Sequence, residues 1–129
     1  MRLNEKEMDV DLINRINRYI DENLQERITL DRLCKEFHYG RTKISTAYKK
    51  LTGVGINTYL MQQRLKRGQE LLEEGKYTVT EIAERTGFAS TQYFSRKFSE
   101  IVGYAPTKYA ELYKENKHRS KSDNLNCTQ

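Results

Sequence analysis

The chain of 129 residues has little proline, glycine or cysteine, and each shortage excludes a class of protein. One proline and seven glycines are too few for an all-β fold rich in tight turns or for a low-complexity chain. The two cysteines, Cys34 and Cys127, lie far apart, so we expect no disulfide framework. Cys34 and His38 could share a helix face, but two ligands are fewer than a zinc site requires, and no metal site is expected.

Long apolar runs are also missing. No segment approaches the roughly 18 consecutive apolar residues of a membrane span. The N-terminal MRLNEKEMDV has charges where the apolar part of a signal peptide would lie, which favours a soluble cytoplasmic protein with no membrane partner. No nucleophile, base and orienting acid recur at catalytic spacing, and no glycine-rich phosphate loop occurs, so we expect neither an enzyme nor a cofactor. The formal net charge of +5 is too small to identify a nucleic-acid binder unaided.

Apolar residues at helical spacing predict an all-α fold of about seven helices. The first helix is expected over residues 9–25, with Asp9 as its cap and Val10 and Leu24 on its apolar face. Thr29 is placed to cap a short second helix. Helices over residues 41–52 and 56–74 follow, and each has a glycine directly after its end.

The second half contains the same signals. Thr78 and Glu81 form a capping box, and a further helix begins near Thr91 with Ile101 on its expected apolar face. Pro106 opens the last helix. These elements predict a first helix-turn-helix subdomain over residues 9–55, a long linker helix over 56–75, a second such subdomain over 76–113, and a disordered basic tail over 114–129.

An internal repeat is the most informative feature of the sequence. Leu33 and Tyr39 match Ile82 and Phe88 at an offset of 49 residues. After a one-residue insertion in the turn, the offset becomes 50 for the matches of Ile44, Ser45, Tyr48, Leu51, Gly53 and Tyr59. Each copy is a short helix, a tight turn and a longer helix with a polar face, which is helix-turn-helix geometry.

Such a repeat could also be two helical hairpins that share a core and recur for stability alone. Charge placement argues against that interpretation. The segment RTKISTAYKK, residues 41–50, holds four basic residues and no acid. The segment STQYFSRK, residues 90–97, also lacks an acid. Polar faces of this composition suit phosphates and base edges, and their recurrence in both copies favours DNA binding.

The sequence resembles the DNA-binding domain of the AraC/XylS family of transcriptional regulators. The resemblance extends from about residue 10 to Tyr113 and is strongest in TEIAERTGF (80–88), QYFSRKF (92–98) and GYAPTKY (103–109). The first copy departs from the family pattern at His38, which stands where Gly87 stands in the second copy, and at Gly40, which replaces a capping serine. We expect the turn to survive, because histidine tolerates a positive φ better than most residues.

The resemblance implies two recognition helices, joined by a rigid helix, that reach successive major-groove segments on one face of double-stranded DNA. A linker of about 18 residues spans about 27 Å, which suits a DNA repeat of ~34 Å. The implied base-facing residues are Arg41, Thr42, Lys43, Ser45, Thr46, Thr91, Gln92, Ser95 and Arg96. The implied phosphate-facing residues are Lys49, Lys50, Ser90 and Lys97.

The resemblance further implies a sequence-specific regulator that binds DNA as a monomer and, as an activator, recruits RNA polymerase. Two alternatives stay open. The chain is either a small stand-alone regulator or the output domain of a longer one. It could also be a protein-interaction module that keeps the fold but has lost DNA binding, because Thr46 stands where Arg96 stands in the second copy.

Overall fold

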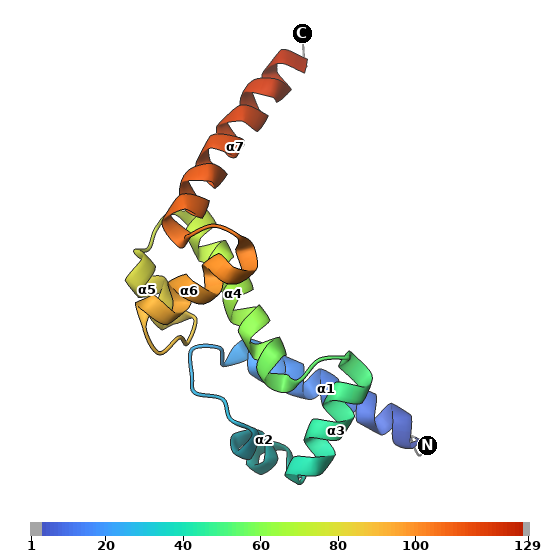
Figure 1. Cartoon of the computed structure of the whole chain (residues 1–129). Coiled ribbons are helices and arrows are strands. Elements are labelled where there is room, and N and C mark those ends of the chain that lie inside the picture. Colours follow the sequence, from blue (N-terminus) through green and yellow to red (C-terminus); the bar gives the residue numbers. More distant parts are fainter. Residues whose placement is uncertain (1–3, 128–129) are drawn as a thin grey trace. The chain divides into compact units, whose positions relative to one another are not determined.

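The computed structural model describes residues 4–127, with their side chains up to residue 117. Within this range the chain forms seven α-helices and no strand, which confirms the all-α prediction (Figure 1). The helices are α1 (Glu5–Glu22), α2 (Leu30–Phe37), α3 (Arg41–Thr52), α4 (Ile56–Glu74), α5 (Val79–Arg85), α6 (Thr91–Val102) and α7 (Pro106–Cys127). The chain divides into two compact units after Arg64, so α4 contributes to both.

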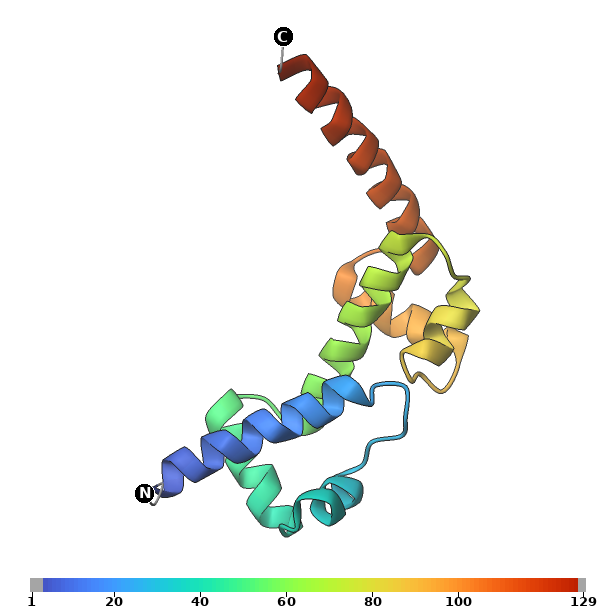
Figure 2. The same cartoon turned by 180° about the vertical axis from the view of Figure 1, so that it is seen from behind.

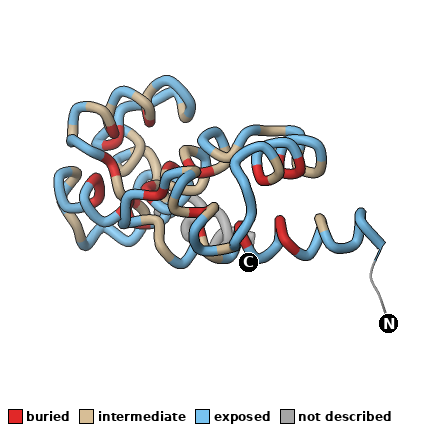
Figure 3. The backbone as a smooth tube through the Cα atoms, turned by 90° about the horizontal axis from the view of Figure 1, so that it is seen from below, coloured by how far each residue is buried: buried red, intermediate tan, exposed pale blue. Residues whose placement is uncertain are grey.

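The first unit is built from α1, α2, α3 and the beginning of α4. Both α1 and α2 pack against α3, and Figure 2 shows α1 lying across it. The buried residues of α1 are spaced three or four apart, or adjacent, and so share one side of the helix. Buried stretches of the chain are coloured red in Figure 3. The core of this unit consists of Leu12, Ile13, Ile16, Ile20, Ile28, Leu33, Ile44, Ala47, Tyr48 and Leu60.

The second unit is built around a chain of aromatic rings from α6 and its neighbours. Phe94 and Phe98 are fully buried. The centroid of the Phe94 ring lies 5.1 Å from that of Phe88 and 5.6 Å from that of Phe98, and Phe98 in turn lies 5.4 Å from Tyr109 of α7. Aromatic pairs at these distances add to the stabilisation from burial. Leu65, Leu71 and Leu72 of α4 are buried in this unit as well.

The turn between α2 and α3 has the backbone conformation that the sequence predicts. Thr29 caps α2 by accepting a hydrogen bond from the Arg32 amide, and His38 ends that helix with φ 61°. Gly87 has φ 84° at the equivalent place in the second unit. The left-handed conformation that glycine adopts without strain is therefore adopted by a histidine in the first unit, as expected.

The first helix begins and ends earlier than predicted. Asn4, not Asp9, caps α1, because its side chain accepts from the Glu7 amide at 2.8 Å while the Glu7 carboxylate accepts from the Asn4 amide. The helix ends at Glu22, and Leu24 packs against the core from beyond that end. Val10 is 43% exposed instead of buried, because it lies to one side of the stripe formed by the four buried residues of α1.

One expectation near the C-terminus is also corrected. Ile101 is 58% exposed, because it lies in the last turn of α6, beyond the ring cluster that forms the core. The last helix, α7, extends as far as Cys127, and the disorder expected for the basic tail over residues 114–129 stays a prediction. The sequence has no proline or glycine after Pro106, so nothing there interrupts the helix hydrogen bonds. The last two residues of that tail lie outside the described range.

Candidate nucleic-acid interface

The exposed face of α3 is polar and carries most of the predicted residues of the first unit. Ile44, Ala47 and Tyr48 face the core. Because an α-helix turns about 100° per residue, the side chains opposite them form a single exposed strip. That strip consists of Thr42, Ser45, Thr46 and Lys49, all of them exposed. Hydroxyl groups and an ammonium group there can bind base edges and phosphates.

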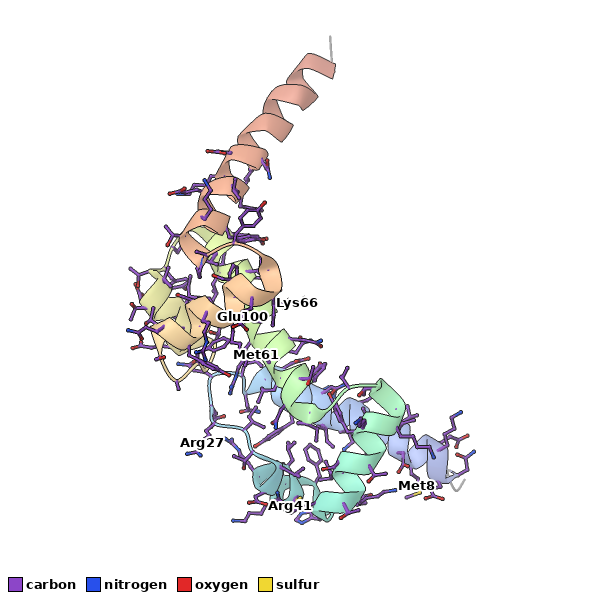
Figure 4. All side chains as sticks on the ribbon, viewed as in Figure 1. Met8, Arg27, Arg41, Met61, Lys66 and Glu100 are labelled. Carbon is purple, nitrogen blue, oxygen red and sulfur yellow. The ribbon has the colours of Figure 1, made fainter. Side chains whose placement is uncertain are left out.

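The two cations in the first turn of α3 are paired with carboxylates from other helices. The guanidinium of Arg41 forms an ion pair with Asp31 of α2, and Figure 4 shows Arg41 at the start of α3 beside α2. The Lys43 ammonium lies 2.8 Å from the Asp9 carboxylate of α1. The hydrogen bond with Asp9 raises the pKa of Lys43. The structure thus places Arg41 and Lys43 at the two edges of the strip and not within it.

Lys49 and Lys50 are the remaining cations of α3. Their side-chain ammonium groups have no ion pair or hydrogen bond among the described residues. With Ser45 and Thr46 they line one shallow depression. A second groove lies next to it, lined by Leu30, Ser45, Lys49, Gly55, Ile56, Asn57 and Thr58. The sequence interpretation did not include Asn57 and Thr58, although polar residues in a helix first turn directly after a glycine-containing loop are a signal for anion contact.

The exposed face of α6 is more sharply defined. Gln92 and Arg96 are both exposed and lie one helical turn apart. The guanidinium of Arg96 lies over the Tyr93 ring, 5.4 Å from its centroid. Thr91 and Ser95 are half-buried beside this pair. Side chains that can bond adenine and guanine bidentately are therefore presented together, with one of them held by a neighbouring ring.

The other two predicted residues of this unit have local partners. The Ser90 hydroxyl oxygen accepts a hydrogen bond from the Tyr93 amide at 3.1 Å and so caps α6. The ammonium of Lys97 lies 3.3 Å from the Glu100 carboxylate, which Figure 4 labels on α6. Lys97 and Arg96 of the second unit thus interact with residues of their own helix. The paired cations of α3 in the first unit interact instead with residues of other helices.

The described part of the chain offers little for other kinds of site. Its side chains contain no group of three or more His, Cys, Asp or Glu residues that could hold a metal ion. None of its helices is long and apolar enough to cross a bilayer. The two polar helix faces are the features with evident binding chemistry.

Comparison with known proteins gives this arrangement a context. A family model described as a helix-turn-helix domain matches residues 33–111. The regulatory protein PocR of Salmonella typhimurium is 30% identical over 101 residues, which cover 78% of this chain and 33% of PocR. The F1 operon positive regulatory protein of Yersinia pestis is 34% identical over 98 residues, covering 75% of this chain and 33% of that protein. The chain therefore spans about a third of the length of these relatives.

Solved structures show the same fold. The DNA-binding domain of AdpA, crystallised with a target DNA, superposes with a TM-score of 0.76 at 27% identity, covering 81% of this chain and 94% of that one. The C-terminal domain of AraT, a response regulator from Geobacillus stearothermophilus, gives a TM-score of 0.75 at 25% identity, covering 78% and 84%. With the family model covering most of the helices, these likenesses show that the chain belongs to the AraC/XylS family of DNA-binding transcriptional regulators.

Proposed function

We propose that this domain recognises a specific duplex sequence by inserting α3 and α6 into successive segments of the major groove. The observation that supports this proposal is an exposed polar strip on the longer helix of each repeat, α3 and α6. In both helices the strip lies opposite the residues that face the core. A relative whose fold matches, the DNA-binding domain of AdpA, was solved with its target DNA. The major groove admits one such helix and presents a distinct pattern of donors and acceptors for each base pair.

Within this proposal the exposed positions divide by chemistry. Gln92 and Arg96 read bases in the second unit, since both are exposed and can bond bidentately. Thr42, Ser45 and Thr46 face bases in the first unit, where single hydroxyl groups give weaker discrimination. Thr91 and Ser95 lie beside the second pair, while Arg41 and Lys43 flank the first set.

Phosphate contact is proposed for four residues with different geometries. Lys49 and Lys50 are exposed and lie together on α3, which favours direct contact with the DNA backbone. Lys97 must leave Glu100 to reach a phosphate. Ser90 uses its oxygen as a helix cap, so only its hydroxyl hydrogen remains to bond an anion.

We further propose that the domain binds as a monomer and activates transcription through contact with RNA polymerase. The support for activation is the printed role of a similar protein, the F1 operon positive regulatory protein. Two reading units in one chain can occupy an asymmetric site without a second copy. We propose a cytoplasmic location, where such a regulator meets the DNA that it binds.

Selection of bound sequences from a random duplex pool tests the central proposal. A sequence-specific regulator enriches one site, and its affinity for that site falls steeply with salt because phosphate contacts release counterions. A protein-interaction module that had lost DNA binding would enrich nothing and would show little affinity for any duplex. That second outcome would overturn the proposal.

A further inference from the structure

The first turn of α3 has an unusual charge arrangement. It contains Arg41 and Lys43 but no acid, and Gly40 gives the helix no side-chain cap. A helix N-terminus carries partial positive charge, so cations there are unfavourable unless anions lie nearby. Asp31 and Asp9 supply those anions from α2 and α1. The two cations in the first turn of α3 are therefore matched to carboxylates before any DNA is present.

The two ion pairs differ in their access to solvent. The side chains of Arg41 and Asp31 are 63% and 69% exposed, whereas those of Lys43 and Asp9 are 39% and 19% exposed. Exposed ion pairs contribute little to stability and exchange partners readily. Arg41 can thus leave Asp31 at small cost, while Lys43 is more firmly attached to α1. Only the first pair is suited to exchange with a ligand.

Arg41 also lies where exchange would matter for recognition. It is one helical turn before Ser45, at the edge of the strip proposed to face bases. Asp31 lies in the first turn of the helix that precedes the turn, and carries a negative charge beside this edge. A phosphate that approaches Arg41 must displace the carboxylate and also meets its repulsion.

We propose that Asp31 is a specificity-determining residue: it keeps Arg41 from binding phosphates of unrelated DNA and releases it only at the proper sequence. A base edge carries no net charge and is not repelled by the Asp31 carboxylate, so Arg41 can bond it bidentately, whereas a phosphate that any sequence offers is repelled. The proposal rests on the DNA recognition proposed above. It concerns the first unit alone, because Thr80 and Thr91 stand at the equivalent positions of the second unit.

The test compares two variants that remove one negative charge each. Asp31→Asn deletes the partner of Arg41, while Asp11→Asn deletes a carboxylate that pairs with Arg15 within α1. Affinity is measured for the selected duplex and for a random duplex between about 0.1 and 0.3 M salt. The control separates a local effect from the change in net charge, because free charges are screened over about 8 Å at physiological salt.

We expect Asp31→Asn to add one phosphate contact on random DNA. The slope of log affinity against log salt should steepen by about 0.9, and affinity for the random duplex at about 0.15 M salt should rise about fivefold. Affinity for the selected duplex should change less than about twofold, so discrimination falls. Asp11→Asn should leave the slope and the discrimination as they are in the unchanged protein.

Arg41→Ala, alone and combined with Asp31→Asn, completes a double-mutant cycle. Alone, it should leave random-duplex affinity unchanged, because Asp31 already withholds that guanidinium, and in the Asp31→Asn background it should remove the whole gain. An Asp31→Asn protein with the same slope and discrimination as Asp11→Asn would overturn this inference while leaving DNA recognition intact. Failure of the unchanged protein to enrich any sequence would overturn both.

Discussion

At the scale of single residues, Gly68 has too little space for a side chain. It lies in the buried face of α4, and a Cβ atom there would be 2.9 Å from Cε1 of the fully buried Phe94 ring. Alanine favours a helix over glycine by about 1 kcal/mol, but overpacking a core costs about 1–3 kcal/mol. We expect Gly68→Ala to destabilise the protein by about 1 kcal/mol in denaturant unfolding.

Gly55→Ala is the matched control, because nothing lies within 4 Å of the Cβ it would add. Gly55 is the N-cap of α4, because its carbonyl accepts the first helix bond from the Tyr59 amide, so the substitution should cost only the preference for glycine over alanine there, about 1 kcal/mol or less. A Gly68→Ala protein as stable as the unsubstituted protein would show that the Phe94 ring can move, contrary to the close packing of the second unit.

The proposed readers and phosphate contacts differ in what their loss should do. Arg96→Ala removes a bidentate donor from α6 and should cost about 1–3 kcal/mol of binding free energy on the selected duplex, with relaxed preference at one base pair.

Lys49→Ala removes an unpaired cation of α3 and should weaken binding to all sequences alike, while the slope of log affinity against log salt becomes shallower by about 0.9. Binding titrations on selected and random duplexes measure both effects.

The assignment of Arg96 would fail if its loss weakened selected and random duplexes equally. Arg85→Ala serves as the control for removal of an exposed arginine, since the Arg85 guanidinium lies over the Tyr77 ring, 4.3 Å from its centroid, and not on the α6 strip. Its substitution should leave the preferred sequence unchanged.

At the scale of secondary-structure elements, the sequence repeat corresponds to equivalent contacts in both units. Tyr48 and Tyr59 have ring centroids 6.0 Å apart, and Phe98 and Tyr109, 50 residues further on, have centroids 5.4 Å apart. Each of the two later tyrosines also donates a hydrogen bond to a carboxylate, Tyr59 to Asp21 and Tyr109 to Glu73. The same helix-to-helix contact is thus made from α4 to α1 and from α7 to α4.

These pairs predict alkaline sensitivity. Burial and the nearby carboxylate raise the pKa of Tyr59 and that of Tyr109 to about 12. An unfolded tyrosine ionises near pH 10, so between about pH 10 and 12 only the unfolded state loses the proton. Folded-state stability should be fully present below pH 10 and should decline through that window. Thermal unfolding measured at a series of pH values checks this.

Tyr59→Phe and Tyr109→Phe each remove one of these groups and should make the alkaline decline shallower, although both lose a hydrogen bond at neutral pH. Tyr104→Phe is the control, since Tyr104 is 51% exposed. A decline as steep in the two buried-site variants as in Tyr104→Phe would assign the sensitivity to other groups.

The sequence predicted the interiors of these elements better than their edges. The bounds of α3 and α4, the capping box at Thr78 and the glycine turns follow from local rules of spacing and capping. Exposure of Val10 and Ile101 could not be predicted, because each depends on where a neighbouring helix stops covering the surface. The ion-pair partners of Arg41 and Lys43 could not be predicted either, because the carboxylates that pair with them come from other helices.

At the scale of the whole molecule, the distribution of charge indicates different roles for the two units. Residues 29–56 carry six basic and two acidic residues, and this surplus alone would give the first unit the stronger attraction for DNA. The ion pairs of Arg41 and Lys43 reduce that surplus at α3. We therefore propose that Lys49 and Lys50 carry most of the attraction that remains there, and that Gln92 and Arg96 give the second unit its greater capacity to read bases.

Two reading helices in one chain predict the form of the selected site. It should contain two conserved blocks whose centres lie about 10 base pairs apart, one helical repeat, so that both blocks face the same side of the duplex. The block read by α6 should be the more strongly conserved, because bidentate contacts discriminate better than single hydroxyl groups. Selection repeated with Gln92→Ala/Arg96→Ala should erase that block and keep the other, whereas Thr42→Ala/Thr46→Ala should do the reverse. A single block, or loss of the same positions in both variants, would mean that only one of the two helices reads DNA.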